Sequence, residues 1–363
     1  MRIAFLTDTY FPQINGVNYA LKNWREELES RGHEVYVVYP KNDHNPGKRE
    51  IELPSVKSRL VDGYRVGVPT FSSVEEKLPD LDAVHSHGQF AAAVLGLYFS
   101  RKNDLPHIAS HHTPGEHYLD YLTKRERVQR GLEKVYTRWE KYIYRKADKV
   151  TAPSEYERKR LQSKVNTEVE TLSNGVDTDF FEEKETDFLE ERGIEAEKVV
   201  GYCGRLCKKK NIEDLIIYAE RFDGEIVVAG GGFKEDYYRN KFEKKENITF
   251  IGRLDRDEMP KFYSSLDLFI TPSTVETQGL TVLEANSCST PVIGANSRAL
   301  KDTIEEGRSG YRYRQGDIDK LDKRVQKAFK RLKRLEKGAK DVAGEHSVEK
   351  TVEKLTCRYR KLG

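Results

Sequence analysis

The alternation of short apolar runs with longer amphipathic segments constrains the fold of this chain more than any other feature. Residues 3–6 and 35–39 are apolar runs of strand length, and residues 17–31 between them have helical periodicity and stop at Gly32. Two strands joined through a helix form a parallel pair. Similar short runs recur at 83–85 and 107–110 and, after Asn174, at 199–203, 226–229, 248–251, 268–270 and 292–294. We therefore predict an α/β chain with two doubly wound, Rossmann-like domains.

The length of the chain indicates two domains rather than one. At 363 residues, it exceeds the roughly 250–300 residues at which single hydrophobic cores stop growing. We predict a first domain over residues 1–172 and a second domain over residues 173–346, facing each other across a cleft. A final helical segment, residues 347–363, follows the second domain.

Charge, cysteine content and apolar runs narrow the class of protein. The net charge of +3 gives no global field that would favour nucleic acid. The four cysteines lack the spacing of metal ligands, which favours a reducing compartment. The first strand begins too close to Met1 for a signal peptide, and the longest apolar run, 91–99, is far shorter than the ~20 residues that span a bilayer. We therefore predict a cytoplasmic protein without nucleic-acid partners.

Two glutamates around the start of a predicted helix form the first candidate site. Glu276 lies in the loop after the strand at residues 268–270. Gly279 opens the next helix, and Glu284 lies about one turn inside it. Ionised carboxylates accept hydrogen bonds from diols, whereas the unpaired N–H groups of residues 279–281 suit a phosphate. The segment presents, in order, the partners of a nucleotide-linked sugar, and the alternative is an amphipathic helix with solvated acids.

A basic turn after another predicted strand forms the second candidate site. The strand at residues 199–203 leads into residues 204–211, which are rich in cations, and then into a helical pattern over 212–221. Ligands of open α/β sheets bind at the carboxyl ends of the strands. Arg205, through its planar guanidinium, and Lys210, as a point charge, are our candidates for a diphosphate. Solvated surface is the alternative for such a turn.

The predicted first domain contributes two further candidates. Gly16 and Val17 stand between the first strand and the first helix, where backbone N–H groups can approach a phosphate. His112 and His87 each follow a short strand. A histidine in that position either completes a ligand site or packs as a structural residue.

Together, these motifs resemble those of the retaining nucleotide-sugar glycosyltransferases of family 4, which have the GT-B fold. The Glu-x-x-Gly-Leu-x-x-x-Glu element of the family matches residues 276–284, and its Gly-Arg-Leu-x-x-x-Lys element matches residues 204–210. Its N-terminal loop matches residues 5–17, and the turn that opens its second domain matches residues 174–177. The resemblance covers the whole chain.

The resemblance implies a role for each candidate residue. The donor-binding residues are Glu276 with the backbone of Gly279, Leu280 and Thr281 for the hexose, Arg205 and Lys210 for the diphosphate, Glu284 for the ribose, Gly16 and Val17 for the phosphates, and His112 for the sugar. Among them, the implied catalytic set is Glu276, Arg205, Lys210 and His112, with no side-chain nucleophile. The final helix, over 348–362, is implied to return to the first domain.

Two departures from the family pattern are visible. Asn211 replaces the usual glycine after the lysine, and residues 297–299 stand where the family often has a Gly-Gly pair near the donor. The second departure leaves the identity of the hexose open.

We predict no required cofactor, Mg²⁺ included, and no metal ligand. Asp-x-Asp pairs occur in the sequence, but none lies beside Arg205 or Glu276 in the motifs. Fixed cations and two helix N-termini can instead meet the charge of the leaving group. Residues 230–232 do not open a helix as a dinucleotide fingerprint would, so we interpret them as a tight turn and disfavour an NAD-dependent oxidoreductase. A non-catalytic nucleotide-sugar-binding subunit is another alternative.

A basic segment bears on the acceptor. Residues 124–146 contain nine basic residues against three acidic ones. Such a helix can lie on an anionic membrane, and the alternative is an apolar stripe that faces the core. A second basic stripe, over 320–340, is compatible with peripheral membrane attachment on the inner membrane face. The apolar residues at helical spacing in the first segment are Val128, Leu132, Val135, Trp139 and Tyr142.

The resemblance also favours those members of the family that glycosylate diacylglycerol or related lipids. Residues 7–17, 111–113, 118–121 and 276–281 carry this part of the likeness. We therefore predict hexose transfer from a UDP- or GDP-sugar, UDP-glucose among them, to a membrane lipid of the diacylglycerol or archaeol type. A soluble sugar or polysaccharide acceptor is the alternative.

Overall fold

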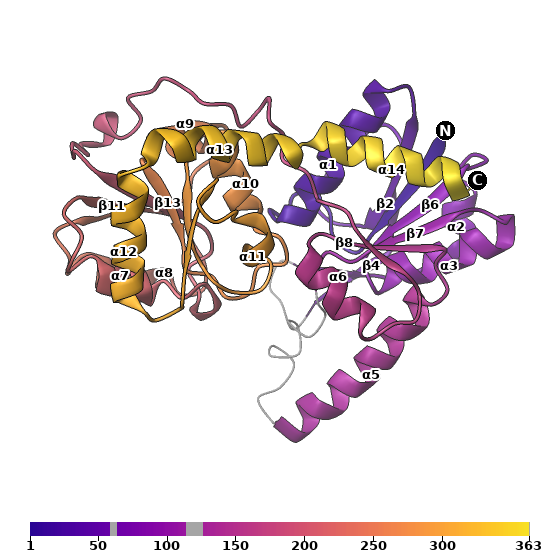
Figure 1. Cartoon of the computed structure of the whole chain (residues 1–363). Helices are drawn as coiled ribbons and strands as arrows, with labels where there is room; N and C mark the ends of the chain where they lie inside the picture. The colour runs from indigo at the N-terminus through magenta and orange to yellow at the C-terminus, as the bar shows by residue number, and fades with distance from the viewer. Residues whose placement is uncertain (59–63, 114–125, 363) are drawn as a thin grey trace. The chain divides into compact units, whose positions relative to one another are not determined.

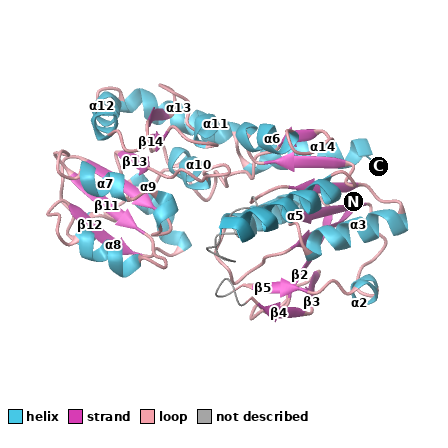
Figure 2. Ribbon diagram, turned by 90° about the horizontal axis from the view of Figure 1, so that it is seen from below, coloured by secondary structure: helices cyan, strands magenta, loops and turns pink. Residues whose placement is uncertain are grey.

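The chain folds into two compact units, each built on a parallel sheet with helices on its faces (Figures 1 and 2). The structure, a computed structural model, describes residues 1–58, 64–113 and 126–362. The first unit comprises Met1–Asn174 and Val348–Gly363, and the second comprises Gly175–Ser347. The predicted α/β class with two Rossmann-like sheets is confirmed.

The sheet of the first unit has the strand order β3-β2-β1-β6-β7-β8-β9, with every neighbouring pair parallel. In register, Phe5 of β1 lies opposite Val37 of β2 on one side and His85 of β6 on the other. The order therefore reverses between β1 and β6. The strands are β1 (Arg2–Thr7), β2 (Glu34–Pro40), β3 (Glu50–Leu53), β6 (Ala83–His87), β7 (His107–Ser110), β8 (Lys149–Ala152) and β9 (Val169–Thr171), with a separate antiparallel hairpin of β4 (Ser55–Lys57) and β5 (Arg65–Gly67).

Helices pack on both faces of this sheet. Ile3 and Phe5 belong to the cluster that includes α1 and α14, whereas Ala4 and Leu6 belong to the cluster that includes α2 and α3. Successive side chains of a strand point to opposite faces, which explains the division. Helices α1 and α14 lie side by side (Figure 1). The helices are α1 (Gly16–Ser30), α2 (Phe71–Glu75), α3 (Ala91–Asn103), α5 (Glu126–Tyr144), α6 (Glu155–Gln162) and α14 (Val348–Leu362).

The sheet of the second unit has the order β12-β11-β10-β13-β14-β15, again with parallel neighbours. Its order reverses between β10 and β13. The strands are β10 (Val199–Cys203), β11 (Glu225–Ala229), β12 (Ile248–Gly252), β13 (Leu268–Thr271), β14 (Val292–Ala295) and β15 (Gly310–Tyr313). The α-helices are α7 (Glu213–Tyr218), α8 (Glu235–Phe242), α9 (Met259–Ser264), α10 (Leu280–Ser287), α11 (Leu300–Thr303), α12 (Ile318–Phe329) and α13 (Leu332–Glu345), and the 3₁₀ turns are η1 (Glu190–Arg192), η2 (Lys208–Lys210) and η3 (Arg256–Glu258).

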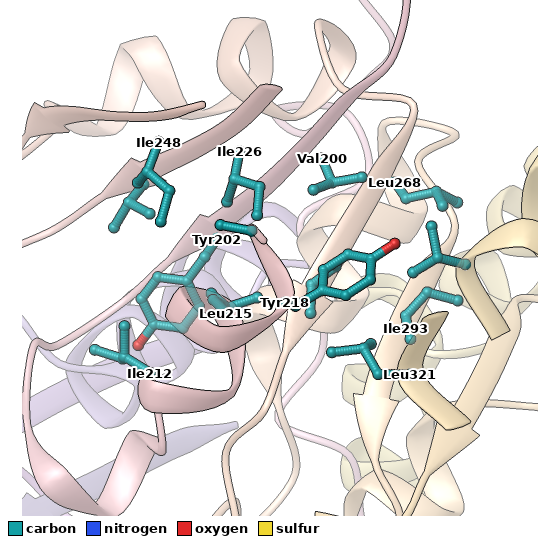
Figure 3. Close-up of a cluster of buried hydrophobic side chains, with 14 of the residues drawn as sticks. Val200, Tyr202, Ile212, Leu215, Tyr218, Ile226, Ile248, Leu268, Ile293 and Leu321 are labelled. Atoms are coloured by element: carbon teal, nitrogen blue, oxygen red, sulfur yellow. The ribbon is translucent and has the colours of Figure 1, made fainter. Parts of the chain in front are cut away.

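A buried cluster on one face of the second sheet holds its central strands in place (Figure 3). Val200 and Leu268, from β10 and β13, meet Leu215 and Tyr218 of α7 and Leu321 of α12, and all five side chains are fully buried. Burying one aliphatic side chain of this size stabilises the fold by about 1.5–3 kcal/mol. The cluster therefore fixes the positions from which the loops after β10 and β13 start.

The apolar side of the basic stripe at residues 320–340 packs on this core. Leu321, Val325 and Leu335 are buried members of the cluster, and Phe329 and Leu332 pack against it. The stripe lies on α12 and α13, where most lysines and arginines are exposed. Arg324 and Lys327 instead lie over the ring of Tyr311 in β15. In the part of the chain that the structure describes, every helix is too short or too polar to cross a bilayer.

Candidate functional site

The two strongest sequence motifs meet at the point where the strand order of the second sheet reverses. Residues 204–211 follow β10, and residues 272–279 follow β13, which is its hydrogen-bonded neighbour. Open parallel sheets bind ligands outside the carboxyl ends of their strands at such a switch point. The topology therefore brings the basic turn and the glutamate motif, which are far apart in the sequence, to one edge of one sheet.

Lys210 and Glu276 form an ion pair across this edge. The Lys210 ammonium contacts Glu276 Oε1, and the side chains are only 16% and 18% exposed. Burial by itself would raise the pKa of Glu276, but the charge and hydrogen bond of Lys210, helped by the charge of Arg205, outweigh burial and lower that pKa. Glu276 is therefore an ionised hydrogen-bond acceptor. Because the pair is mostly shielded from water, the attraction between its two charges is stronger than it would be in bulk solvent.

The backbone of the basic turn explains how it accommodates a departure from the family pattern. Asn211 has a φ of +51°, in the left-handed region that favours glycine and that asparagine tolerates better than most residues. It directly follows the 3₁₀ turn η2, which ends at Lys210. Arg205, earlier in the same turn, is exposed. The turn therefore keeps a fixed lysine and an accessible arginine next to each other.

Gly279 caps the helix that follows the glutamate motif. Its φ of +93° is left-handed, and a Cβ there would lie 3.0 Å from Leu300 Cδ2. The first intrahelical bond of α10 runs from the N–H of Val282 to Gly279 O at 3.0 Å. The N–H groups of Leu280 and Thr281 thus precede the helical ladder and, with the positive end of the helix dipole, suit an anion.

Glu284 lies on the first turns of α10 but does not join the Lys210–Glu276 pair. Its Oε2 accepts a hydrogen bond from the Tyr263 hydroxyl at 2.9 Å. Burial raises the pKa of Glu284, while this hydrogen bond and the charge of Arg256 act against burial. The two glutamates of the motif therefore have different surroundings, one beside a cation and the other beside a phenol.

The predicted residues of the first unit follow its own switch point. Gly16 and Val17 are the first residues of α1, which follows β1. The side chain of Asn15 caps this helix by accepting from the N–H of Asn18 at 2.9 Å. Gly16 is exposed, so its backbone is accessible to a ligand.

His112 is packed into a chain of hydrogen bonds. Its Nε2 lies 3.1 Å from His87 Nδ1, and its Nδ1 lies 3.0 Å from Asn174 Oδ1. Burial lowers the pKa of His112 to about 4, although the bond to Asn174 raises it. The ring is therefore neutral at pH 7. Only 7% of the residue is exposed, so it can offer a ligand a ring edge and not a positive charge.

Sequence reasoning missed several residues that hold this site together. In the sequence, Tyr263 has the pattern of an ordinary aromatic core residue of a helix. Its distance along the chain from Glu284 does not predict the hydrogen bond between them. Asn174 appears in a family motif, but its role as a partner of His112 depends on folding. Gln89 accepts from Trp139 Nε1 through its carbonyl at 2.6 Å and donates to the Tyr144 hydroxyl at 3.0 Å, tying α5 to the loop after β6.

Helix α5 is packed chiefly through its C-terminal half. Trp139 makes the bond to Gln89, and Ile143 is buried. Residues 124 and 125 of the basic run, and the motif residues 118–121, lie outside the described residues. The N-terminal end of α5 extends beyond the rest of the first unit (Figure 1). The exposed members of its predicted apolar stripe are Val128 (45%), Val135 (66%) and Tyr142 (43%).

Within residues 1–58, 64–113 and 126–362, no group of three or more His, Cys, Asp or Glu side chains is arranged to hold a metal ion. Arg205 and Lys210 follow β10, and α10 begins at Leu280 in the segment after β13.

Comparison with known proteins relates the sequence of this chain to two family models and to several enzymes. Residues 14–180 match the family model Glycosyltransferase Family 4, and residues 183–342 match the model Glycosyl transferases group 1. An alpha-monoglucosyldiacylglycerol synthase of Streptococcus pneumoniae is 31% identical, over 86% of this chain and 75% of that protein. A GDP-mannose-dependent alpha-mannosyltransferase of Corynebacterium glutamicum is 26% identical, over 85% and 76% of the two chains.

A solved structure supports the same fold. HepE from Anabaena, in complex with UDP and glucose, superposes with a TM-score of 0.78 over 100% of both chains at 17% identity. The predicted GT-B fold is thereby confirmed.

Proposed function

The chain belongs to glycosyltransferase family 4, and we propose that this glycosyltransferase moves a hexose from a UDP- or GDP-sugar to a membrane lipid with retention of configuration. The observation that carries the donor part of the proposal is the Lys210–Glu276 ion pair beside Arg205 at the β10/β13 switch point. A sugar diphosphate needs cations for its phosphates and acceptors for its hydroxyls, and this edge of the sheet offers both.

Within this proposal, each residue has a chemical task. Glu276 accepts hydrogen bonds from the hexose, with the backbone of residues 279–281 beside it. Lys210 and Arg205 neutralise the diphosphate, and their charges count most as the sugar–phosphate bond breaks. Glu284 accepts from the ribose diol. The opening residues of α1, Gly16 and Val17, supply backbone N–H groups to the phosphates.

The chemical step requires no side-chain nucleophile. The bond between the anomeric carbon and the phosphate oxygen breaks, and the acceptor oxygen bonds to that carbon on the same face. The proton of the acceptor hydroxyl passes to the departing phosphate, which becomes the second product. His112 is neutral because its pKa is near 4, and both of its ring nitrogens bond to His87 and Asn174, so it meets the sugar through its ring edge and delivers no proton.

The acceptor part of the proposal rests on α5. The exposed basic residues of α5 include Arg127, Arg130, Lys134 and Arg138, and the helix also exposes Val128 and Val135. Of the acidic residues of α5 whose side chains the structure describes, Glu140 is buried and Glu133 is exposed, so basic residues outnumber acidic ones on the exposed surface. An exposed apolar strip between cations complements an anionic lipid surface, where each basic residue contributes about 1 kcal/mol. The diacylglycerol synthase among the relatives supports a lipid acceptor of that class.

The donor part is tested by incubating the protein with UDP-glucose, UDP-galactose and GDP-mannose, with diacylglycerol in anionic vesicles as acceptor. We expect one of these donors to yield a glycolipid whose anomeric configuration matches that of the donor. The proposal would be contradicted by a product of inverted configuration. It would also be contradicted if the protein transferred or hydrolysed the sugar of none of the three donors.

The membrane part is tested by reversing charge on α5. Replacing Arg127, Arg130, Lys134 and Arg138 by Glu should abolish co-sedimentation with anionic vesicles and reduce lipid glycosylation, while slow hydrolysis of the donor persists. The matched control replaces Lys320, Lys323, Lys330 and Lys333 by Glu, which changes the net charge equally on helices whose apolar sides face the core. Equal loss of vesicle binding in both variants would show that binding depends on the net charge of the protein and not on α5 in particular.

A soluble acceptor is the second candidate. It would gain support if the α5 variant glycosylated lipid as well as the parent protein does and if a sugar or polysaccharide were the better acceptor. Raising the salt concentration provides an independent check, because attraction between α5 and the vesicle should weaken as the Debye length shortens.

A further inference from the structure

The phenol of Tyr263 holds the carboxylate of Glu284. Tyr263 donates its hydroxyl proton to Glu284 Oε2 at 2.9 Å. An ionised carboxylate has about four lone-pair positions on its two oxygens. The bond to Tyr263 therefore restricts the rotation of the carboxylate and leaves acceptor positions on both oxygens for a ligand.

Tyr263 is itself fixed more firmly than the acid that it holds. The residue is 0% exposed, and its ring meets that of Phe269 edge to face with centroids 5.4 Å apart. Its backbone carbonyl accepts a hydrogen bond from Thr290 Oγ1 at 2.7 Å, and Thr290 is also buried. Packing in the core therefore holds the Tyr263 hydroxyl in one fixed position. It acts as a preorganised donor of the kind that keeps functional groups in place.

The electrostatic surroundings make this bond important to the state of the acid. Burial raises the pKa of Glu284, and the Tyr263 hydroxyl is the first of the groups that lower it, followed by the charge of Arg256. Both residues come from the segment formed by η3 and α9. That segment therefore favours the ionised form, which accepts hydrogen bonds from two hydroxyls better than a protonated carboxyl does.

We propose that Tyr263 is a positioning residue that orients Glu284 toward the two ribose hydroxyls of the donor and so sets the preference for ribonucleotides over 2′-deoxyribonucleotides. This inference rests on the proposed function, in which Glu284 binds the ribose. A carboxylate contacts a vicinal diol with both oxygens only when its plane has the correct orientation. Without the tyrosine hydroxyl, the carboxylate rotates and the advantage of the second ribose hydroxyl falls. Contacts to the diphosphate are unaffected, because Lys210 and Arg205 belong to another loop.

The test compares nucleotide binding in the Tyr263→Phe variant and the parent protein. Calorimetry measures the affinities for UDP and 2′-deoxy-UDP, and for GDP and 2′-deoxy-GDP. For the nucleotide base that the parent binds, the ratio of ribo to deoxy affinity should fall by about three- to tenfold in Tyr263→Phe, the size of one net hydrogen bond. The affinity for the deoxy nucleotide should change by less than about twofold.

A matched control removes another buried tyrosine hydroxyl from the same unit. Tyr313 donates to Asp214 Oδ2 at 2.9 Å, and neither residue is placed in the donor site. Tyr313→Phe should leave the ribo-to-deoxy ratio unchanged even if it lowers stability. A double-mutant cycle adds a second readout: in a Glu284→Ala background, Tyr263→Phe should no longer alter the ratio, because its effect passes through Glu284.

The outcomes separate this inference from the proposed function. If the parent binds neither UDP nor GDP, both are overturned. If the parent prefers the ribonucleotide but Tyr263→Phe keeps the same ratio, the positioning role fails while the donor site stands. An equal loss of affinity for ribo and deoxy nucleotides would show that the tyrosine only supports the fold.

Discussion

The two units differ in the side chains that they place at the carboxyl ends of their parallel strands. In the second unit, the loops after β10 and β13 bring together a lysine and a glutamate as an ion pair, Lys210 with Glu276. In the first unit, β6 ends at His87, whose ring is hydrogen-bonded to His112 after β7. Burial lowers the pKa of both histidines, so the pair is neutral.

This difference makes the second unit the better candidate for binding a charged ligand. A lysine in an ion pair keeps its charge and can share it with a phosphate, and its glutamate partner can accept from a sugar hydroxyl. Buried neutral rings contribute shape and one hydrogen bond at most, because charging them means desolvating a cation. These charges are the reason for our proposal that the second unit binds the diphosphate.

The largest effect should come from removing the cations. Lys210→Ala and Arg205→Ala are each expected to lower turnover by on the order of 10²- to 10³-fold, because each removes a fixed charge from the developing diphosphate. Steady-state rates with the preferred donor measure the effect. Lys208→Ala is the control, since Lys208 is an exposed neighbour in the same basic turn. Turnover near that of the parent in both site variants, with circular dichroism unchanged, would remove the diphosphate role.

A smaller effect should distinguish the neutral histidines by pH. The pKa of His112 is about 4 in the folded chain, below its ordinary value of 6.5, so the unfolded chain binds more protons between these values. Stability is therefore complete above pH 6.5 and is lost as the pH falls toward 4. Between pH 7 and 5, this single group should account for about 2 kcal/mol.

The effect of His112 on stability can be measured by a signal that comes from the first unit alone. Trp24 packs against the rings of His85, His87 and His112, and both tryptophans of the chain lie in that unit. Denaturant unfolding followed by tryptophan fluorescence should show a shallower loss of stability on acidification in His112→Gln than in the parent. Equal slopes in the two proteins would mean that His112 is not buried in its neutral form.

Much of the fold followed from the sequence because apolar periodicity reflects burial directly. The predicted runs at 107–110 and 199–203 coincide with β7 and β10. At residues 320–340, the sequence was compatible with membrane attachment, and the structure shows that the apolar stripe there covers the sheet. Periodicity shows that a helix has an apolar side and does not show what covers that side.

The site was predictable only where the ligand chemistry is local in the sequence. Glu276, Gly279 and Glu284 share one segment, and the resemblance connects them with Lys210. The bond from Tyr263 to Glu284 and that from Asn174 to His112 join distant segments through tertiary packing. No spacing rule reports such contacts, so they became visible only in the folded chain.

The smallest effect concerns metal ions. Since Arg205, Lys210 and the α10 N-terminus can meet the phosphate charge, EDTA should lower the initial rate by less than about twofold. The rate before and after adding the chelator, and again after adding excess Mg²⁺, measures this. Complete loss that Mg²⁺ restores would show that the fixed cations do not suffice.

The contrast between the two units is tested most directly by calorimetric titration of the parent, Lys210→Ala and Glu276→Gln with a nucleoside diphosphate and its sugar conjugate, UDP with UDP-glucose and GDP with GDP-mannose. We expect Lys210→Ala to weaken binding of the diphosphate by at least about tenfold, the effect of losing a charged hydrogen bond. Glu276→Gln should bind the diphosphate as the parent does but lose the added affinity for the sugar conjugate. Parent-like binding of both ligands by Lys210→Ala would contradict the assignment of the diphosphate to the second unit.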